Sequence, residues 1–180
     1  MDMVQQRAAS EHPMTRRMAI IRPVRLGLIV VAAAVLAGMA WYLVSPLFVD
    51  HRVSEATPPD VEAASVPTHR GSFGEVDAIH KGAGQATFYL RPDGRTVLRL
   101  ESFEVTNGPD LYVYVSGHPR PRTSTQLHDG FSYEVAVLKG NVGDQNYELP
   151  PDLDVSRVKS VVIYCRRFTT VFSTAELQPA

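Results

Sequence analysis

The single cysteine of the chain, Cys165, is the residue whose type and position most suggest chemistry. It ends an apolar run and is followed directly by Arg166 and Arg167. A thiolate is both a nucleophile and a metal ligand, and neighbouring cations stabilise it. From the residues alone, three roles stay open for Cys165: a redox thiol or cofactor ligand, an inert core residue, or one half of an intermolecular disulfide.

The apolar run that Cys165 ends predicts a buried strand. In a strand, alternate side chains point to opposite faces. One face then carries Val161, Ile163 and Cys165, and the other carries Val162 and Tyr164. Both faces are apolar, which is typical of a central strand covered on both sides. This pattern favours the inert reading, because free cysteine is among the most buried residue types.

His80 and Asp110 are candidates for binding a cofactor together with the cysteine. His80 opens a segment with flexible glycines at positions 82 and 84, and Asp110 ends an Asn-Gly-Pro-Asp sequence. Each also has an ordinary structural role. A histidine beside glycines is commonly a solvated turn residue, and an aspartate in such a turn binds neighbouring main-chain N–H groups. The residues favour these structural roles.

A metal or haem site would need partners for the sulfur. Blue-copper sites combine two histidines and a cysteine with a weak axial ligand, usually methionine, and all five methionines lie at or before Met39. We therefore expect no copper and no other metal site. The chain has no C-x-x-C-H sequence, which excludes covalently attached c-type haem, whereas a non-covalent haem or another prosthetic group stays open. No Gly-x-Ser-x-Gly or H-E-x-x-H sequence indicates a hydrolase.

Residues 26–49 contain no Asp, Glu, Lys, Arg or His and predict a transmembrane helix. About 20 apolar residues span the ~30 Å hydrocarbon core. Arginines precede the span at positions 7, 16, 17, 22 and 25, so the positive-inside bias places residues 1–25 in the cytoplasm and the rest of the chain outside it. A signal peptide cleaved near residues 38–40 is the alternative. The apolar run continues well beyond that point, which favours an uncleaved anchor in the lipid bilayer.

The remainder divides into a linker and one domain. Residues 50–68 are rich in Ala, Ser, Pro and Glu and show neither helical nor strand alternation, so we expect a poorly ordered tether. Residues 69–180 are enough for one compact domain with a core. The chain has 18 basic and 19 acidic residues, and no basic stripe indicates nucleic-acid binding.

The domain reads as short strands separated by turns. The runs at 84–90 and 95–101 flank Arg-Pro-Asp-Gly, a turn sequence, and predict a β-hairpin. Further predicted strands lie at 111–116, 133–138, 144–149, 159–165 and 169–173, with one short helical turn at 152–158. This pattern indicates an all-β domain, an antiparallel sandwich or barrel.

Several segments, in this order and spacing, resemble the DM13 domain family over residues 71–177. They are Gly71-Ser-Phe73, residues 80–84, 100–116 and 138–150, and the segment around Cys165. The resemblance implies an all-β extracytoplasmic domain proposed to act in electron transfer or redox modification at the cell surface. It also implies that Cys165 matches a family cysteine suggested to work as a bare thiol or as the ligand of a prosthetic group.

Two hypotheses of different class follow. In the first, the protein is a membrane-tethered redox domain whose Cys165 reacts with an extracytoplasmic partner protein. In the second, it is a non-catalytic module that binds a ligand or an envelope protein, and Cys165 only fills the core. The exposure of Cys165 bears directly on this choice.

Overall fold

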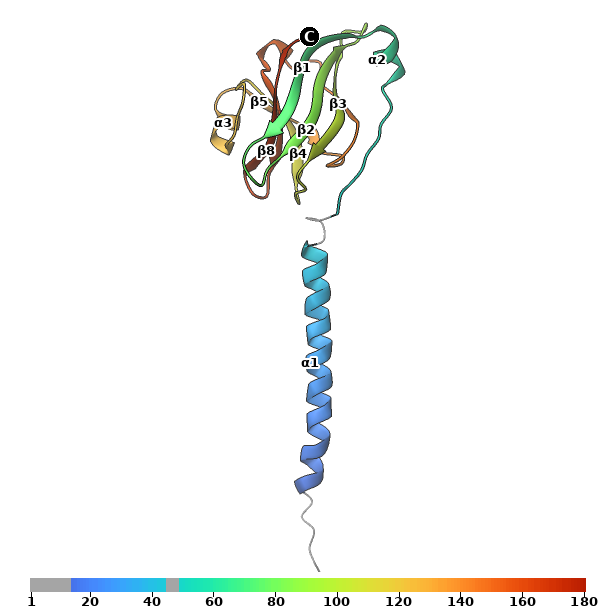
Figure 1. The fold of residues 1–180 in the computed structure, drawn as a ribbon, viewed down its shortest axis with the longest axis vertical. Coiled ribbons are helices and arrows are strands. Elements are labelled where there is room, and N and C mark those ends of the chain that lie inside the picture. The colour runs from blue at the N-terminus through green and yellow to red at the C-terminus, as the bar shows by residue number, and fades with distance from the viewer. Residues whose placement is uncertain (1–13, 45–48) are drawn as a thin grey trace, which may run out of the picture. The chain divides into compact units, whose positions relative to one another are not determined.

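The computed structural model describes the main chain of residues 14–44 and 49–180. The chain divides into two compact units, Met1–Ser45 and Pro46–Ala180, which are described separately. The first contains a single described helix, and the second contains all the strands (Figure 1).

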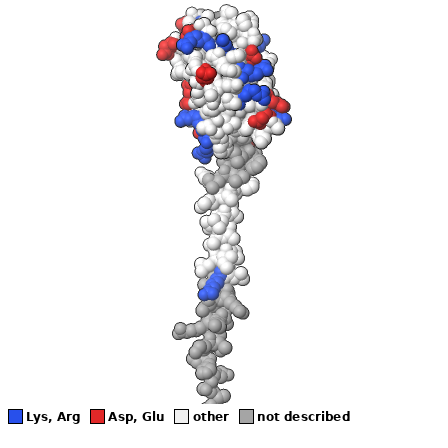
Figure 2. Space-filling model, turned by 90° about the vertical axis from the view of Figure 1, so that its left-hand side faces the viewer, with Lys and Arg blue, Asp and Glu red and all other residues white. Residues whose placement is uncertain are grey.

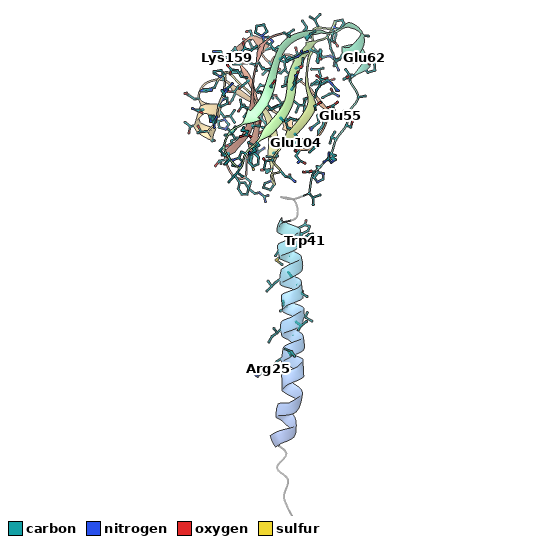
Figure 3. The ribbon with its side chains drawn as sticks, in the orientation of Figure 1. Arg25, Trp41, Glu55, Glu62, Glu104 and Lys159 are labelled. Atoms are coloured by element: carbon teal, nitrogen blue, oxygen red, sulfur yellow. The ribbon has the colours of Figure 1, made fainter. Side chains whose placement is uncertain are left out.

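Helix α1 spans Met14–Val44 and is long and apolar enough to cross a membrane. Its stretch Arg25–Tyr42 has a mean hydropathy of 1.8 and no buried part. Figure 3 labels Arg25, the first residue of that stretch, and Trp41, near its other end, and Figure 2 draws most of the described helix surface white, without Lys, Arg, Asp or Glu. Helix α1 begins within the predicted tail of residues 1–25, and Val49, the last residue of the predicted span 26–49, is not helical. Positions 1–13 and 45–48 lie outside the described residues.

The second unit is built on one antiparallel sheet that curls into a nearly closed barrel. The strand order is β5-β4-β7-β8-β1-β2-β3-β6, and β9 pairs with β1. The elements are α2 (Pro59–Ala64), β1 (Val66–Glu75), β2 (Gly82–Leu90), β3 (Thr96–Val105), β4 (Leu111–Ser116), α3 (Ser124–His128), β5 (Ser132–Val137), β6 (Gln145–Glu148), the 3-10 helix η2 (Val155–Arg157), β7 (Ser160–Cys165), β8 (Thr170–Glu176) and β9 (Gln178–Pro179). The predicted all-β class is confirmed.

The predicted hairpin is formed by β2 and β3, which pair from Leu90–Thr96 at the turn to Gly82–Val105 at the far end. At the turn, the Arg91 N–H donates to the Arg95 carbonyl at 2.8 Å. Gly94 has a φ of +84°, a left-handed conformation that glycine adopts without steric cost. The turn chemistry read from the sequence therefore holds in the structure.

Strand β7 lies between β4 and β8 and is buried along its whole length. Val161, Ile163 and Cys165 belong to the larger apolar cluster of the barrel. Val162 and Tyr164 belong to a second cluster on the other face. The predicted alternation is confirmed, and both faces of β7 are covered because α3 and neighbouring side chains pack over the second one.

Residues 49–56, named here the strap, differ from the predicted disordered tether at 50–68. The Val53 N–H donates to the Val142 carbonyl at 2.9 Å, and the Glu55 N–H donates to the Asp144 carbonyl at 2.9 Å. The strap thereby pairs with residues 142–144, directly before β6, and reaches β6 itself through the Asn146 N–H, which donates to Glu55 Oε2. The other side of β6 pairs with β3. Exposed strand edges invite unwanted pairing, so a covering segment protects the fold. Main-chain and polar contacts hold the strap, which is why no hydrophobic period marks it in the sequence.

The rest of the predicted tether is also ordered. Residues 59–64 form α2, in which Asp60 pairs with the buried Arg91 guanidinium, and β1 begins at Val66. The compact unit therefore starts well before the predicted domain boundary at residue 69.

Candidate functional site

Four loops meet at the end of the barrel where β7 ends. Strand pairing places them there, because Cys165 pairs with Leu111 at the start of β4 and with Thr170 at the start of β8. The loops connect β1 to β2, β3 to β4, β5 to β6 and β7 to β8. The first carries His80, the second carries Asp110, and Cys165 directly precedes the fourth. The sheet thus brings all three predicted site residues to one end of the barrel.

Cys165 is a free thiol and is completely buried, with 0% exposure. It belongs to the same apolar cluster as Leu111 and Phe172. A disulfide with a second chain would need a surface sulfur, and this sulfur is not at the surface. In the described state, Cys165 is packed as a small apolar side chain.

The guanidinium groups of the two arginines that follow Cys165 lie away from its sulfur. The Arg166 guanidinium lies over the Tyr112 ring, 4.5 Å from its centroid, and its Nη1 is 3.3 Å from Glu134 Oε1. Tyr112 packs on the second cluster, on the opposite face of the sheet from Cys165. Arg167 is exposed. The thiolate stabilisation that the sequence suggested is therefore absent from the described contacts of these residues.

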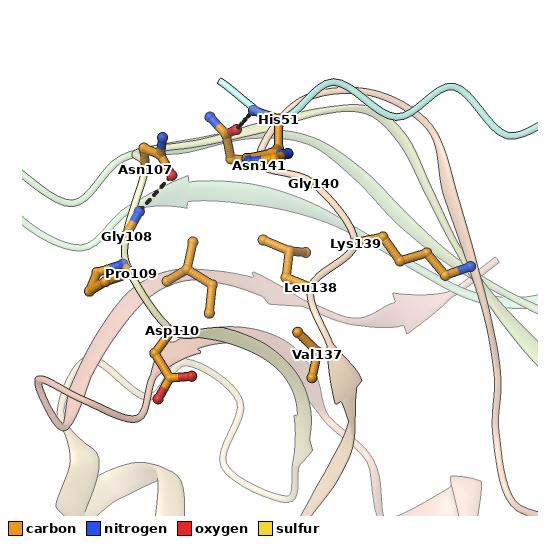
Figure 4. A pocket seen from close by; sticks show the side chains of 11 residues that line it. His51, Asn107, Gly108, Pro109, Asp110, Val137, Leu138, Lys139, Gly140 and Asn141 are labelled. Atoms are coloured by element: carbon orange, nitrogen blue, oxygen red, sulfur yellow. Dashed lines mark hydrogen bonds between the residues drawn. The ribbon is translucent and has the colours of Figure 1, made fainter. Parts of the chain in front are cut away.

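A pocket of about 280 Å³ opens between the β3–β4 and β5–β6 loops (Figure 4). Its lining is His51, residues 107–111 and residues 137–141. Leu111 connects this pocket to the cysteine, because it lines the pocket and is also the cross-strand partner of Cys165. Directly paired residues have neighbouring side chains on the same face of a sheet. Cys165 therefore lies one side chain behind the pocket wall.

Asp110 lines this pocket and has a structural role at its edge. Its carbonyl accepts a hydrogen bond from the Arg166 N–H at 3.1 Å, which ties the β3–β4 loop to the turn after Cys165. Its carboxylate points away from His51 and Asn141 (Figure 4). Within the same loop, the Gly108 N–H donates to Asn107 Oδ1 at 2.9 Å, as expected for an Asn-Gly-Pro-Asp turn.

His80 belongs to the β1–β2 turn and does not line the pocket. Its Nδ1 is 2.7 Å from Asp77 Oδ2, and its ring lies 4.4 Å from the ring of Phe172. The hydrogen bond from the His80 side chain, helped by main-chain N–H groups of His80 and Ile79, lowers the pKa of Asp77 to about 2. The contacts show a capped turn packed on Phe172, and His80 and Cys165 do not share a ligand position.

The described residues around Cys165 do not fit a prosthetic group bound through its sulfur. The sulfur lies among apolar side chains, and it is not part of the pocket lining. Among residues with described side chains, no group of three or more His, Cys, Asp and Glu could hold a metal ion. A haem or metal ligand role would need a second donor and open space at the sulfur, and the packing supplies neither.

Two asparagines that the sequence does not mark as site residues tie the strap to the loops around the pocket. Asn107 Nδ2 donates to the Val49 carbonyl at 2.6 Å. Asn141 Oδ1 accepts from the His51 N–H at 2.7 Å, and its Nδ2 donates to Asp50 Oδ1 at 2.9 Å. The available signal was the pair of glycines at 140 and 143, since glycine often marks a close approach of another main chain.

Comparison with protein families gave one match, to the family described as Electron transfer DM13, over residues 73–177. This confirms the resemblance drawn from the sequence. The strap and α2 lie before the matched residues. Comparisons with curated proteins and with solved structures gave no match to the chain.

Proposed function

Since the chain belongs to the DM13 family of electron-transfer domains, we propose that it is a membrane-anchored domain that exchanges electrons through Cys165 outside the cytoplasm. The observation that carries this proposal is the place of Cys165. It is the only cysteine of the chain, it lies within the family match, and it sits directly behind the wall of a pocket.

Helix α1 supports the anchored part of the proposal. Its apolar stretch is followed by few cations and preceded by several arginines, including Arg16, Arg17, Arg22 and Arg25. Arginine and lysine concentrate on the cytoplasmic side of membrane spans. This bias supports an extracytoplasmic barrel, on the side of the membrane where disulfide chemistry is sustained.

The chemistry proposed for Cys165 is thiol–disulfide exchange with a disulfide of an extracytoplasmic partner protein. The Cys165 thiolate attacks one partner sulfur, and a Cys165–partner S–S bond forms as the partner's own S–S bond breaks. The second partner sulfur leaves as a thiolate and takes up a proton. At this stage the Cys165 sulfur is oxidised and one partner sulfur is reduced. A dithiol protein on the same side of the membrane completes the transfer: one of its thiolates attacks the Cys165 sulfur and releases the partner as a dithiol. Its second thiolate then closes the dithiol protein's own S–S bond and frees Cys165 as a thiolate, so that two electrons pass from the dithiol protein to the partner disulfide.

Complete burial of Cys165 sets a condition on this step. The sulfur must become accessible through a local opening, since partner sulfurs cannot reach it in the closed state. Local openings that cost less than global unfolding are general in proteins and are concentrated in loops. The loops around the pocket flank Leu111, the cross-strand partner of Cys165, and we propose that they open in this way.

The same burial favours a second candidate function, a binding module in which Cys165 is a core residue. The test uses the full-length chain in lipid nanodiscs. The probe is an aromatic disulfide, dithiobis(nitrobenzoate), which is Ellman's reagent. The redox proposal predicts one released thionitrobenzoate per chain, no release from Cys165→Ala, and a rate nearly independent of low denaturant concentrations. A rate that rises with denaturant as steeply as global unfolding does would favour the binding module.

The anchor is tested separately by alkaline washing of membranes that contain the full-length chain. Retention in the membrane pellet and digestion of the barrel only by protease added from the extracytoplasmic side are the expected results. Release by the wash would contradict a spanning α1.

A further inference from the structure

We propose that the strap is a latch that controls access to Cys165. This inference rests on the proposed function, in which the thiol is reached from the adjacent pocket. The pocket lies between two loops, β3–β4 and β5–β6, and the strap is hydrogen-bonded to both of them. One short segment therefore ties together the two sides of the opening (Figure 4).

The first attachment is on the β3–β4 loop. Asn107 donates from Nδ2 to the Val49 carbonyl at 2.6 Å, while its Oδ1 accepts from the Gly108 N–H. Residues 108–110 then lead directly into Leu111, the wall between pocket and cysteine. Movement of this loop away from the barrel displaces the side chain that shields Cys165.

The second attachment is on the β5–β6 loop. Asn141 is only 5% exposed and bonds the strap twice, through the His51 N–H and the Asp50 carboxylate. Its own carbonyl accepts from the Val105 N–H at 2.9 Å, which fixes the residue to the end of β3. When the strap is released, the buried side-chain amide of Asn141 loses both of its hydrogen bonds to the strap. This loss favours the latched state.

The strap follows α1 closely in the sequence. Residues 45–48 join the end of α1 at Val44 to Val49, the residue that Asn107 binds. A partner or a force that acts on this connection acts first on Val49 and then on His51. Release would begin at the pocket, and the remainder of the strap stays attached to β6 through Glu55 and Asn146.

That distal attachment supplies a matched control. Asn146 donates from Nδ2 to the Ala56 carbonyl at 3.0 Å and accepts from Arg99 Nη1 at 2.8 Å, but it does not line the pocket. Asn146→Ala therefore weakens the strap away from the two loops. Asn107→Ala and Asn141→Ala weaken it at the loops.

The experiment measures the rate at which N-ethylmaleimide alkylates Cys165 in the full-length chain in lipid nanodiscs, followed by mass spectrometry. Asn107→Ala removes one hydrogen bond to the strap and Asn141→Ala removes two, and each is expected to raise the rate about tenfold or more through the opening equilibrium. Asn146→Ala is expected to raise it by less than about threefold. Denaturant midpoints of all four proteins establish how much of each rate comes from global unfolding.

Two results would overturn the latch: equal rates in all four proteins, or an equal rise in all three variants, which would indicate fraying of the whole strap. Asn107→Ala and Asn141→Ala alter attachments to different loops. If one of them does not fold, the other still provides the test. The experiment with Ellman's reagent compares the unsubstituted protein with Cys165→Ala. If Cys165 exchanges with the reagent but its alkylation rate does not depend on the strap variants, only the latch proposal is wrong. If the alkylation rate depends on the strap variants but no disulfide exchange occurs, only the redox proposal is wrong.

Discussion

Gly143 lies against the main chain of Val53 so closely that a Cβ at position 143 would come within 1.9 Å of the Val53 carbonyl oxygen. Gly140 has the same relation to His51, whose carbonyl oxygen would be 2.4 Å from an added Cβ. Side chains never approach a main chain this closely. The docked strap therefore requires glycine at both positions, and the β5–β6 loop is shaped to receive it.

The first prediction compares Gly143→Ala with Gly94→Ala. Both glycines have positive φ, +105° and +84°, but only position 143 is also in close contact with another segment. Gly94→Ala should cost about 1 kcal/mol of unfolding free energy, the price of a left-handed alanine. Gly143→Ala should cost at least about 3 kcal/mol, because strain and a collision with Val53 combine.

Urea unfolding of the full-length chain, followed by tyrosine fluorescence or circular dichroism, measures both free energies. Similar losses in the two variants would show that the strap yields to the new methyl group without cost. That result would contradict a tightly docked strap.

The second prediction concerns the two small replacements of Cys165. Alanine leaves an apolar side chain in an apolar cluster and should lower the unfolding free energy by only about 1 kcal/mol. Serine places a hydroxyl beside Leu111 and Phe172 without a partner and should cost roughly 1–3 kcal/mol more than alanine. If serine is tolerated as well as alanine in denaturant titrations, the site is wetter than its packing indicates.

Much of the barrel could be predicted from the sequence because its central strands alternate between two apolar faces. Strand β7 is the clearest case, since both of its faces are apolar and both are buried. Strand β1 was not predicted as a strand. Most of its residues are exposed or half-buried and it contains a proline and two glycines, so its pairing with β2 and β8 places it in the sheet.

The candidate site was only partly predictable. The order of motifs identified the family and made Cys165, His80 and Asp110 candidate site residues. Their spacing in the sequence could not show that His80 packs on Phe172 and not beside the cysteine. The position of Arg166 directly after Cys165 left open whether its charge lies near the sulfur, and in the structure its guanidinium lies over Tyr112, on the opposite face. Asn141 binds Asp50 across 91 positions of sequence through polar groups, which leave no periodic signal.

The third prediction is a depressed titration of Asp77. Hydrogen bonds from the His80 side chain and from main-chain N–H groups lower its pKa to about 2. Ionised Asp77 therefore stabilises the β1–β2 turn above the ordinary pKa of 3.8, and this contribution is lost as the pH falls through 2. Carboxyl carbon NMR should show the low midpoint, and His80→Ala should move it upward. A midpoint unaffected by His80→Ala would show that main-chain groups alone cause the shift.

The fourth prediction links acid to release of the strap. Burial raises the pKa of Glu55, but hydrogen bonds from Lys139 and Asn146 and the Lys139 charge outweigh it and leave the pKa below 4.5. A lowered pKa means that ionised Glu55 favours the docked strap above 4.5 and that this stabilisation is lost as the pH falls through the lowered value. The main-chain N–H of Asn146 donates to Glu55 Oε2 at 2.8 Å. Its protection against hydrogen exchange should therefore fall as the pH is lowered below 4.5 and Glu55 takes up a proton.

Glu55→Gln is the matched control for this pH dependence, because it keeps the shape of the side chain and removes its titration. Its Asn146 protection should already be low at neutral pH and should change little as the pH falls. Asp50 lies in the strap and Asp144 contacts it, and both are the same in the two proteins. The difference between the two proteins therefore isolates Glu55, and an identical pH dependence in both would show that Glu55 is not its source.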